Sequence, residues 1–153
     1  MGRIELIQDK EFMLSIVNDP EFIERISEGQ CNALSKDDIN AMIKLGYVLG
    51  WLVDDVLRGF YWVHPLTRTI LQIHAHFKKD QRQHARGSGI AMLDWLRENA
   101  KTDVRKFIAM IPDCYPDVIG FSLREGLAFE SKLCQASLKG DKLHDVIIMG
   151  ASR

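Results

Sequence analysis

The chain has 153 residues, a length typical of one domain with one hydrophobic core. Hydrophobic residues make up 46% and charged residues 27%, proportions that exclude an intrinsically disordered chain. The 20 basic and 21 acidic side chains give a formal net charge of −1, which excludes a basic surface for nonspecific nucleic-acid binding. We therefore expect a single soluble domain over residues 1–153 with no nucleic-acid partner.

The cysteines and the N-terminal residues indicate the compartment. Cys31, Cys114 and Cys134 are odd in number and widely spaced, so they favour neither a disulfide framework nor a Cys-x-x-Cys metal site. The first residues mix acids and amides where a signal peptide needs an apolar run, and no later run reaches membrane-spanning length. We expect a cytoplasmic protein with no membrane partner.

The first part of the chain predicts one strand and two helices. Residues 4–7 form a short apolar run that suits a strand. Asp9 can cap a helix with apolar side chains at helical spacing, ending near Asn18. Asp19 followed by Pro20 is a second N-terminal signal, and that short helix should end at Gly29.

Residues 45–77 are rich in β-branched and aromatic side chains and predict three strands in a meander. The short turn at Asp54 and Asp55 requires an antiparallel hairpin, and Pro65 ends the second strand because it cannot donate to a ladder. Residues 78–85 are polar and should form an exposed linker. The sequence then predicts an amphipathic helix over residues 88–100.

The last third predicts a strand over residues 106–111, a helix over 116–125 that Gly126 stops, and a final pair of strands over 129–137 and 144–149. The expected order is therefore strand, two helices, three strands, helix, strand, helix and two strands.

A glycine-rich segment opens the amphipathic helix. Residues 86–91 read Arg-Gly-Ser-Gly-Ile-Ala, between an apolar strand and the helix. Small residues let the backbone approach a ligand closely, and the free amides and dipole of a helix start favour a bound pyrophosphate. Arg86 adds positive charge, and Arg82 and His84 lie close to it in the sequence. The alternative is a glycine-rich turn that merely begins a helix.

This segment resembles the Arg/Gln-x-x-Gly-x-Gly/Ala signature of the GNAT superfamily of N-acetyltransferases, and the element order extends the resemblance over essentially the whole chain. The resemblance implies a mixed α+β fold, with a central, mostly antiparallel sheet flanked by helices and one splayed pair of strands. It also implies that acetyl-CoA is the cosubstrate and that an amine of a small molecule or protein is acetylated.

The resemblance places the donor between two strands of the sheet. The pantetheine arm should enter the gap between residues 69–77 and 106–111, against the backbone of Ala75, His76, Phe77 and Lys78. The residues implied for the pyrophosphate are Arg82, Arg86, Gly87, Ser88, Gly89, Ile90 and Ala91. The segment 78–85 is longer than in many members of the superfamily.

Acetylation of an amine needs a base, and histidine suits this task because its ordinary pKa lies near neutrality. His74 and His76 are two residues apart on a predicted strand, so their side chains share one face. Either can be the base, or both can pack beside aromatic residues of the neighbouring strand. A zinc site would need a further ligand from His64, His84 or a cysteine, and because no spacing indicates one, we predict no metal.

The departing thiolate needs a proton, and the chain departs here from the superfamily pattern. Many members carry an asparagine, a tyrosine seven residues later and Gly-Phe four residues further on. Counting back from Gly126 places Ser122 at the tyrosine position and Tyr115 at the asparagine position. Serine is a poor general acid, so Tyr115, Cys114 or solvent remain as proton donors. Nothing in the sequence indicates a lowered pKa that would make Cys114 a nucleophile.

The acceptor is not encoded in a recognisable pattern. Trp51, Trp62, Trp95 and the pair Phe60–Tyr61 can line a pocket or belong to the core, and among them we consider Trp62 for the acceptor. Asp54 and Asp55 can attract a cation but are typical turn residues.

A second function keeps the fold without the chemistry. The missing tyrosine and a looser similarity to acetyltransferase-like proteins of tailed bacteriophages imply a binding or assembly protein, located in the host cytoplasm or the virion. No pattern encodes the oligomeric state, although an exposed final strand can pair with a second copy in a homodimer or with a protein partner.

Overall fold

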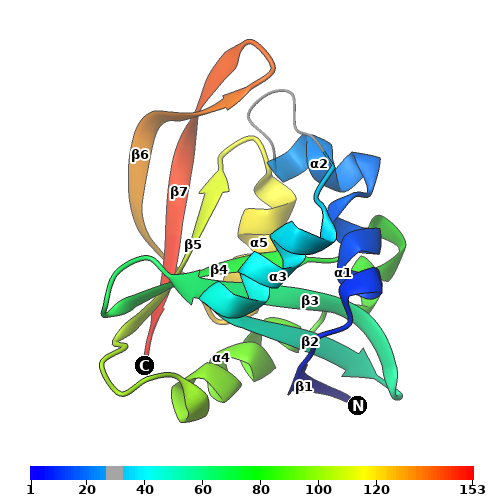
Figure 1. The fold of residues 1–153 in the computed structure, drawn as a ribbon. Coiled ribbons are helices and arrows are strands. Elements are labelled where there is room, and N and C mark those ends of the chain that lie inside the picture. The colour runs from blue at the N-terminus through cyan, green and yellow to red at the C-terminus, as the bar shows by residue number, and fades with distance from the viewer. Residues whose placement is uncertain (27–32) are drawn as a thin grey trace.

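The structure is a computed structural model that describes residues 1–26 and 33–153. Its centre is a seven-stranded sheet in the order β1-β2-β3-β4-β5-β7-β6 (Figure 1). The strands are β1 (Gly2–Leu6), β2 (Tyr47–Val53), β3 (Val56–Pro65), β4 (Ile70–His76), β5 (Lys106–Pro112), β6 (Ala128–Lys139) and β7 (Lys142–Ser152). The helices are α1 (Lys10–Val17), α2 (Pro20–Ile26), α3 (Lys36–Leu45), the 3₁₀ helix η1 (Lys79–His84), α4 (Ser88–Asn99) and α5 (Pro116–Arg124).

The predicted mixed α+β fold with one splayed pair of strands is confirmed. All neighbouring strands are antiparallel except β4 and β5, which are parallel. These two strands pair only from Ile70 opposite Lys106 to Gln72 opposite Ile108. Beyond that point β4 continues along β3, and β5 continues along β7. The two strands therefore separate toward their C-terminal ends.

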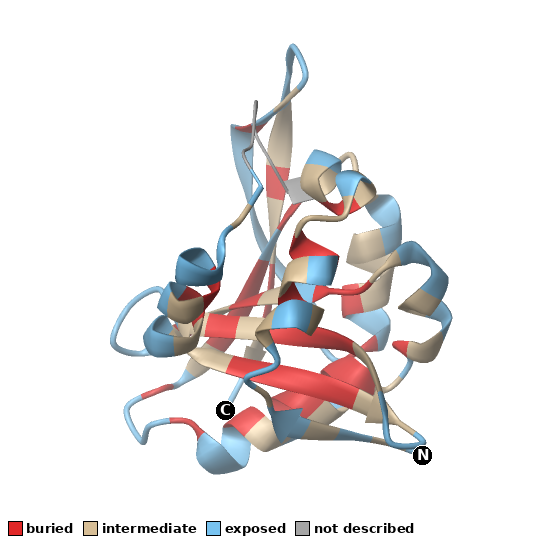
Figure 2. Ribbon diagram, turned by 45° about the vertical axis from the view of Figure 1, so that its right-hand side comes forward, coloured by how far each residue is buried: buried red, intermediate tan, exposed pale blue. Residues whose placement is uncertain are grey.

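The sheet divides the core into two layers, and strand alternation assigns the residues to them. Phe60 of β3 packs with α1, α2 and α3, whereas its neighbour Tyr61 packs with α4. Buried positions follow the central strands and the helix faces turned toward them (Figure 2). The helices of the two layers cover opposite faces of the sheet, so the splayed strands have one layer on each side.

The described residues before β2 already contain three helices, so the prediction of two was wrong. The missed helix, α3, begins with a capping box at Ser35 and Asp38. The Asp38 amide donates to Ser35 Oγ (3.3 Å), and the Ser35 amide donates to Asp38 Oδ2 (2.7 Å). The Ser-x-x-Asp spacing was the signal available in the sequence. The predicted end of the second helix at Gly29 lies outside the described residues.

Several turns follow the predicted chemistry. Asp54 and Asp55 both have positive φ, 51° and 61°, in the hairpin between β2 and β3. Gly126 has φ 96° and follows the end of α5.

The prediction of an exposed linker over residues 78–85 was wrong, because residues 79–84 form η1 and Ala85 is buried. Trp51 Nε1 donates to the His84 carbonyl (2.7 Å), which holds this segment against the sheet.

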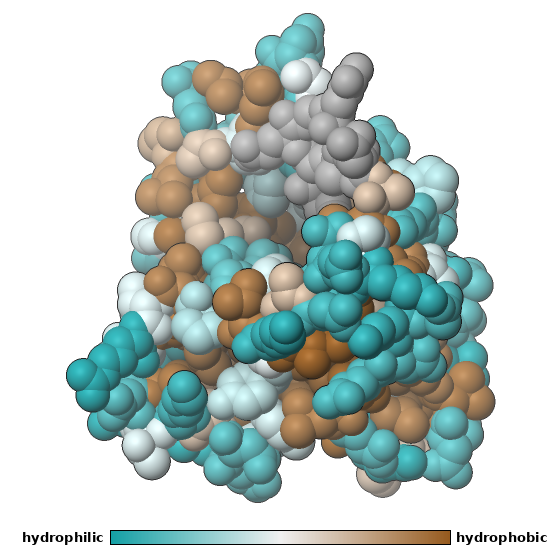
Figure 3. Space-filling model, viewed as in Figure 1, coloured by the Kyte–Doolittle hydropathy of each residue, from teal (hydrophilic) through white to brown (hydrophobic). Residues whose placement is uncertain are grey.

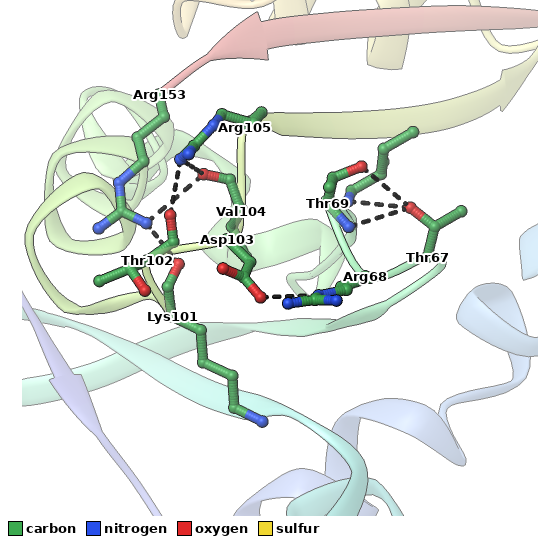
Figure 4. A network of polar contacts seen from close by, with 10 residues as sticks. Thr67, Arg68, Thr69, Lys101, Thr102, Asp103, Val104, Arg105 and Arg153 are labelled. Carbon is green, nitrogen blue, oxygen red and sulfur yellow. Dashed lines mark hydrogen bonds and ion pairs between the residues drawn. The ribbon is translucent and has the colours of Figure 1, made fainter.

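Polar contacts fasten the point where β4 and β5 begin (Figure 4). The Arg105 amide donates to the Thr69 carbonyl (2.8 Å), which ties the two strands together just before their short ladder. The Arg153 guanidinium donates to the Ala100 carbonyl (3.0 Å), and Arg105 Nη1 donates to the Thr102 carbonyl (2.6 Å). This network fixes the closed end of the splayed pair.

The hairpin of β6 and β7 is longer than predicted and lies at the edge of the sheet. Its register shifts between Leu133 and Ser137, which bends β6. Hydrophobic residues gather on this side of the molecule (Figure 3). Phe129, Leu133 and Leu143 of the hairpin are exposed. Within the described residues, no helix combines the length and hydrophobicity needed to cross a membrane.

Candidate active site

A cavity of about 810 Å³ opens where β4 and β5 separate. Two of its walls are strand segments, residues 73–77 on one side and residues 109–112 on the other. On one side it reaches α1, α2 and α3 at Val17, Phe22 and Met42. On the other side it reaches the start of α4 and the inner face of α5. The gap is therefore open to both layers of the fold.

The structure brings residues of both predicted sets to this cavity. The predicted residues that line it are His74, Ala75, His76, Phe77, Arg82, Gly89, Tyr115 and Ser122. Lys78 instead borders a shallow depression with Glu21 and Asp80. Arg86 and Ile90 are exposed at the helix start, beside Gly87, the buried Ser88 and the half-buried Ala91. The predicted donor and catalytic groups thus converge on one region.

His74 and His76 share one face of β4, as the spacing predicts, and both rings stack on aromatic residues of β3. The His76 ring lies 4.4 Å from Phe60, with 3° between the planes, and the His74 ring lies 5.2 Å from Trp62. His76 Nδ1 lies 3.1 Å from the His74 carbonyl and donates to it. Both histidines therefore pack beside aromatic residues of the neighbouring strand, one of the two roles that the sequence left open, and both rings also line the cavity.

Both histidines are held in the neutral form. Burial lowers the pKa of His76 to about 3, with a smaller contribution from His74. Burial also lowers the pKa of His74 to about 4, assisted by the nearby His64. At neutral pH each imidazole has one unprotonated nitrogen that can accept a proton, although a low pKa makes it a weak base.

His64 lies beside His74 across the β3–β4 pair, with 3.0 Å between their Nε2 atoms. One ring donates its N–H to the lone pair of the other, which satisfies both groups. In residues 1–26 and 33–153 no group of three or more His, Cys, Asp or Glu side chains is arranged to hold a metal ion.

Tyr115 and Ser122 differ in what they offer as proton donors. Ser122 is a buried residue of α5, whereas Tyr115 is half-buried and immediately precedes that helix. Burial raises the pKa of the Tyr115 phenol above its ordinary value, with a further contribution from Cys114. The guanidinium of Arg25 lies 5.1 Å and the Lys139 ammonium 5.7 Å from the centre of the Tyr115 ring. Tyr115 is therefore protonated at neutral pH and held in place.

Some of the aromatic residues that the sequence offered for an acceptor pocket line the cavity, and the others belong to the core. Tyr61 and Trp62 line the cavity, and Trp62 Nε1 donates to the Met42 carbonyl (3.0 Å). Phe60 is fully buried in the layer of α1 to α3, and Trp95 packs edge-on against Tyr47. The acidic pair at 54 and 55 forms the hairpin turn, where Asp55 pairs with Arg3 (2.6 Å).

The start of α4 has a defined geometry. Gly87 is its N-cap with φ 80°, a conformation that L side chains rarely adopt. Ser88 Oγ donates to the Ala85 carbonyl (2.6 Å) and lies 2.6 Å from the buried Tyr61 hydroxyl. These contacts fix the turn from the inside.

Glu125 is a site residue that no sequence pattern identified. It follows α5, is buried, and accepts two hydrogen bonds from the start of α4. The Gly87 amide donates to its Oε1 (2.9 Å), and the Gly89 amide donates to its Oε2 (2.8 Å). A Cβ at residue 89 would lie 2.5 Å from Glu125 Cβ. Glu125 lies 36 residues beyond Gly89, so local spacing could not reveal the contact.

The site fits the two ends of acetyl-CoA differently. The gap between β4 and β5 has the unpaired strand edges that a pantetheine arm would use. Of the four amides at the helix start, those of Gly87 and Gly89 bind Glu125, and that of Ser88 donates to Ala85 (3.0 Å). In the described part of the chain only the Ile90 amide of these four has no partner. A diphosphate that used the Gly87 and Gly89 amides would therefore have to displace the Glu125 carboxylate.

Comparisons with known proteins bear on the fold. No family model matches the sequence, and no curated protein does. Spermidine N-acetyltransferase from Vibrio cholerae, in complex with CoA and spermine, has a similar structure with a TM-score of 0.80 and 12% identity, over 99% of this chain and 95% of that one. The ribosomal-protein-alanine N-acetyltransferase from Brucella melitensis matches with a TM-score of 0.77 and 16% identity, over 98% of this chain and 99% of the other. A GNAT superfamily phosphinothricin acetyltransferase from Sinorhizobium meliloti, in complex with AcCoA, matches with a TM-score of 0.75 and 12% identity, over 99% of this chain and 88% of the other.

The chain has the GNAT fold. Each of these comparisons covers at least 98% of this chain. At identities of 12% to 16% the likeness concerns the GNAT fold alone, and the activity has to be argued from the site.

Proposed function

We propose that the protein is an acetyl-CoA-dependent N-acetyltransferase that acts on an amine of a small molecule or a protein. The observation that carries the proposal is the separation of β4 from β5 after Gln72, which opens a cavity between two strand edges. A fold that served only as a scaffold would gain stability by continuing this ladder. Two of the solved structures with this fold hold CoA or AcCoA, which adds support.

The donor would lie against the free edge of β4. The backbone from Ala75 to Lys78 offers groups that an extended pantetheine arm can use as a strand partner. Gly89 lies at the cavity wall and Arg86 is exposed beside it, so the diphosphate would meet the start of α4 and this guanidinium. Arg82 lines the cavity and adds a second positive charge.

Acetyl-CoA supplies an acetyl thioester, in which the C–S bond breaks as the amine nitrogen bonds to the carbonyl carbon. His74 or His76 accepts the proton that the amine loses, since both rings line the cavity and are neutral. Tyr115 gives a proton to the sulfur, since its phenol remains protonated well above neutral pH. Ser122 is the weaker candidate because its hydroxyl is shorter and less acidic.

A binding or assembly protein is the second candidate function. The observation that favours it is the Glu125 carboxylate, which occupies two amides that would receive a diphosphate. The serine at position 122 also departs from the superfamily pattern. In this function the exposed edge strand β6 would pair with a second copy or another protein. The similarity to tailed-phage proteins would place such a role in a virion or the host cytoplasm.

Calorimetric titration with acetyl-CoA tests the proposal. Ala75→Trp places a large ring on an exposed position of the cavity wall, so we expect the variant to fold and to lose binding. Ala128→Trp, at an exposed position on β6, is the matched control and should bind like the wild type. Absence of binding to the wild-type protein at millimolar acetyl-CoA would overturn the enzyme function in favour of the binding function.

A further inference from the structure

The carboxylate of Glu125 binds the start of α4 as an external anion would. Both of its oxygens accept a backbone amide, at 2.9 Å from Gly87 and 2.8 Å from Gly89. The residue is 5% exposed, so these bonds form with little competition from water. The positive end of the helix dipole further favours a negative charge at this point. The protein therefore contains its own anion at the turn.

The close fit between Glu125 and Gly89 makes this contact specific. A Cβ at residue 89 would come within 2.5 Å of Glu125 Cβ and 3.2 Å of its Oε2. Glycine is thus needed here for the carboxylate to approach the backbone. The glycine at the fourth position of the Arg-Gly-Ser-Gly-Ile-Ala segment is explained by an internal side chain, with no bound cofactor required.

An amide N–H has a single hydrogen to donate, so a diphosphate cannot use the Gly87 and Gly89 amides while Glu125 holds them. A carboxylate and a diphosphate in adjacent positions would also repel each other in this buried region. We propose that Glu125 is a built-in competitor for the diphosphate of CoA and sets the affinity for the acyl donor. The proposal rests on the proposed acetyltransferase function for the identity of the donor.

The competition acts on one part of the donor only. The pantetheine arm would bind between β4 and β5, whereas Glu125 occupies amides at the start of α4. Removing the Glu125 charge should therefore favour CoA and inorganic pyrophosphate but leave the binding of pantetheine unchanged. This difference separates competition at the turn from a general change in the cavity.

Glu125→Gln is the decisive variant because it keeps the shape of the side chain and removes its charge. Glutamine has one acceptor oxygen, so it can hold only one of the two amides. We expect it to bind CoA and inorganic pyrophosphate at least about tenfold more tightly than the wild type, and pantetheine equally. Glu98→Gln, which removes an exposed charge from the other end of α4, is the matched control and should behave like the wild type.

The outcomes of calorimetry separate this inference from the proposed function. Equal affinity of the wild type and Glu125→Gln for CoA and for pyrophosphate overturns the inference, while tight CoA binding by both proteins leaves the acetyltransferase function standing. Tighter pyrophosphate binding by Glu125→Gln, with CoA and pantetheine bound by neither protein, supports competition for a diphosphate at the turn but overturns both CoA as its ligand and the acetyltransferase function. Failure of both proteins to bind any of the three ligands overturns both.

A spectroscopic measurement follows the two amides directly and shows that the variant is folded. In the wild-type protein the Gly87 and Gly89 amide protons should resonate downfield and exchange slowly, since each donates to a carboxylate. Pyrophosphate should shift these two signals in Glu125→Gln at concentrations that leave them unmoved in the wild type. If both proteins respond alike, Glu125 does not compete.

Discussion

The imidazole of His76 lies parallel to the ring of Phe60, with 4.4 Å between the ring centres and 3° between their planes. Phe22 covers the same imidazole at 5.0 Å, so the ring is enclosed by apolar groups. A protonated imidazole would lose its hydration there, which is why the pKa of His76 falls to about 3. The position of these rings therefore couples folding to pH.

Stability should fall in acid because of this enclosure. The ordinary histidine pKa is 6.5, whereas folding lowers the pKa of His76 to about 3 and that of His74 to about 4. Between pH 6.5 and the lowered pKa of each ring, the unfolded chain binds a proton that the folded chain does not. Each histidine therefore lowers the free energy of unfolding by up to about 1.4 kcal/mol for every unit by which the pH falls in that window. Above pH 6.5 both states carry neutral rings and this contribution is constant.

Urea denaturation at pH 7.5 and pH 5.5 measures this effect. His76→Phe keeps a stacked ring and removes one titrating group, so the variant should gain stability relative to the wild type as the pH falls. His84→Gln, at the end of η1, serves as the control and should follow the wild type. Parallel pH curves for the wild type and His76→Phe would contradict the burial of a neutral His76.

The catalytic base is tested by comparing two histidines that touch each other. His74→Gln should lower kcat by about a hundredfold with little change in affinity for acetyl-CoA, since general base catalysis contributes about that factor. His64→Gln removes only the partner of the 3.0 Å Nε2 contact and should cost less. Steady-state kinetics at saturating acetyl-CoA measures both. Equal losses in the two variants would indicate that the pair acts through packing.

Because the pKa of His74 lies near 4, its ionisation should not appear in the rate profile between pH 6 and pH 9. Any rise of kcat/KM with pH in that range should follow the pKa of the amine acceptor. Exchanging one acceptor amine for another of different pKa should move the profile accordingly. A profile that stays fixed when the acceptor changes would assign the ionisation to the protein.

Tyr115 and Ser122 offer a matched pair for the proton donor. Tyr115→Phe keeps the ring near Arg25 and removes only the hydroxyl, so kcat should fall at least tenfold while stability and donor affinity stay constant. Ser122→Ala should leave kcat within about a factor of two. The reverse ranking would assign the donor role to Ser122.

The sequence was sufficient for the features that depend on local chemistry. Residues 54 and 55, Gly126 and the Gly87 helix start have the turn geometry that their residue types predict. The prediction of a splayed pair of strands rested on the resemblance to the superfamily, and no pattern in residues 69–77 indicates it. The α3 helix was missed although the sequence carries two signals for it, the capping box of Ser35 and Asp38 and the apolar Ile39 and Met42 three residues apart. The role of Glu125 could not be predicted, since a buried hydrogen bond between residues 36 apart depends on how α4 and α5 pack.

The two glycines near this contact should respond oppositely to alanine. At Gly89 a Cβ would lie 2.5 Å from Glu125 Cβ, which is closer than real contacts allow, so α4 or α5 must shift. At Gly120, inside α5, the nearest atom is Arg124 Nη1 at 3.3 Å, the end of a flexible side chain that can move away. Alanine at position 120 should therefore stabilise the helix by up to about 1 kcal/mol, because alanine loses less conformational freedom than glycine on folding.

Gly89→Ala should instead destabilise the protein by about 1 to 3 kcal/mol and weaken the Glu125 hydrogen bonds, since overpacking separates the carboxylate from its two amides. Chemical denaturation gives the two free energies of unfolding, and hydrogen exchange of the Gly87 amide reports the loss of its acceptor at the α4 start. Faster exchange in Gly89→Ala with unchanged exchange in Gly120→Ala is the expected result. If both alanine variants are equally stable and protect the Gly87 amide equally, the close packing of Glu125 against Gly89 is refuted.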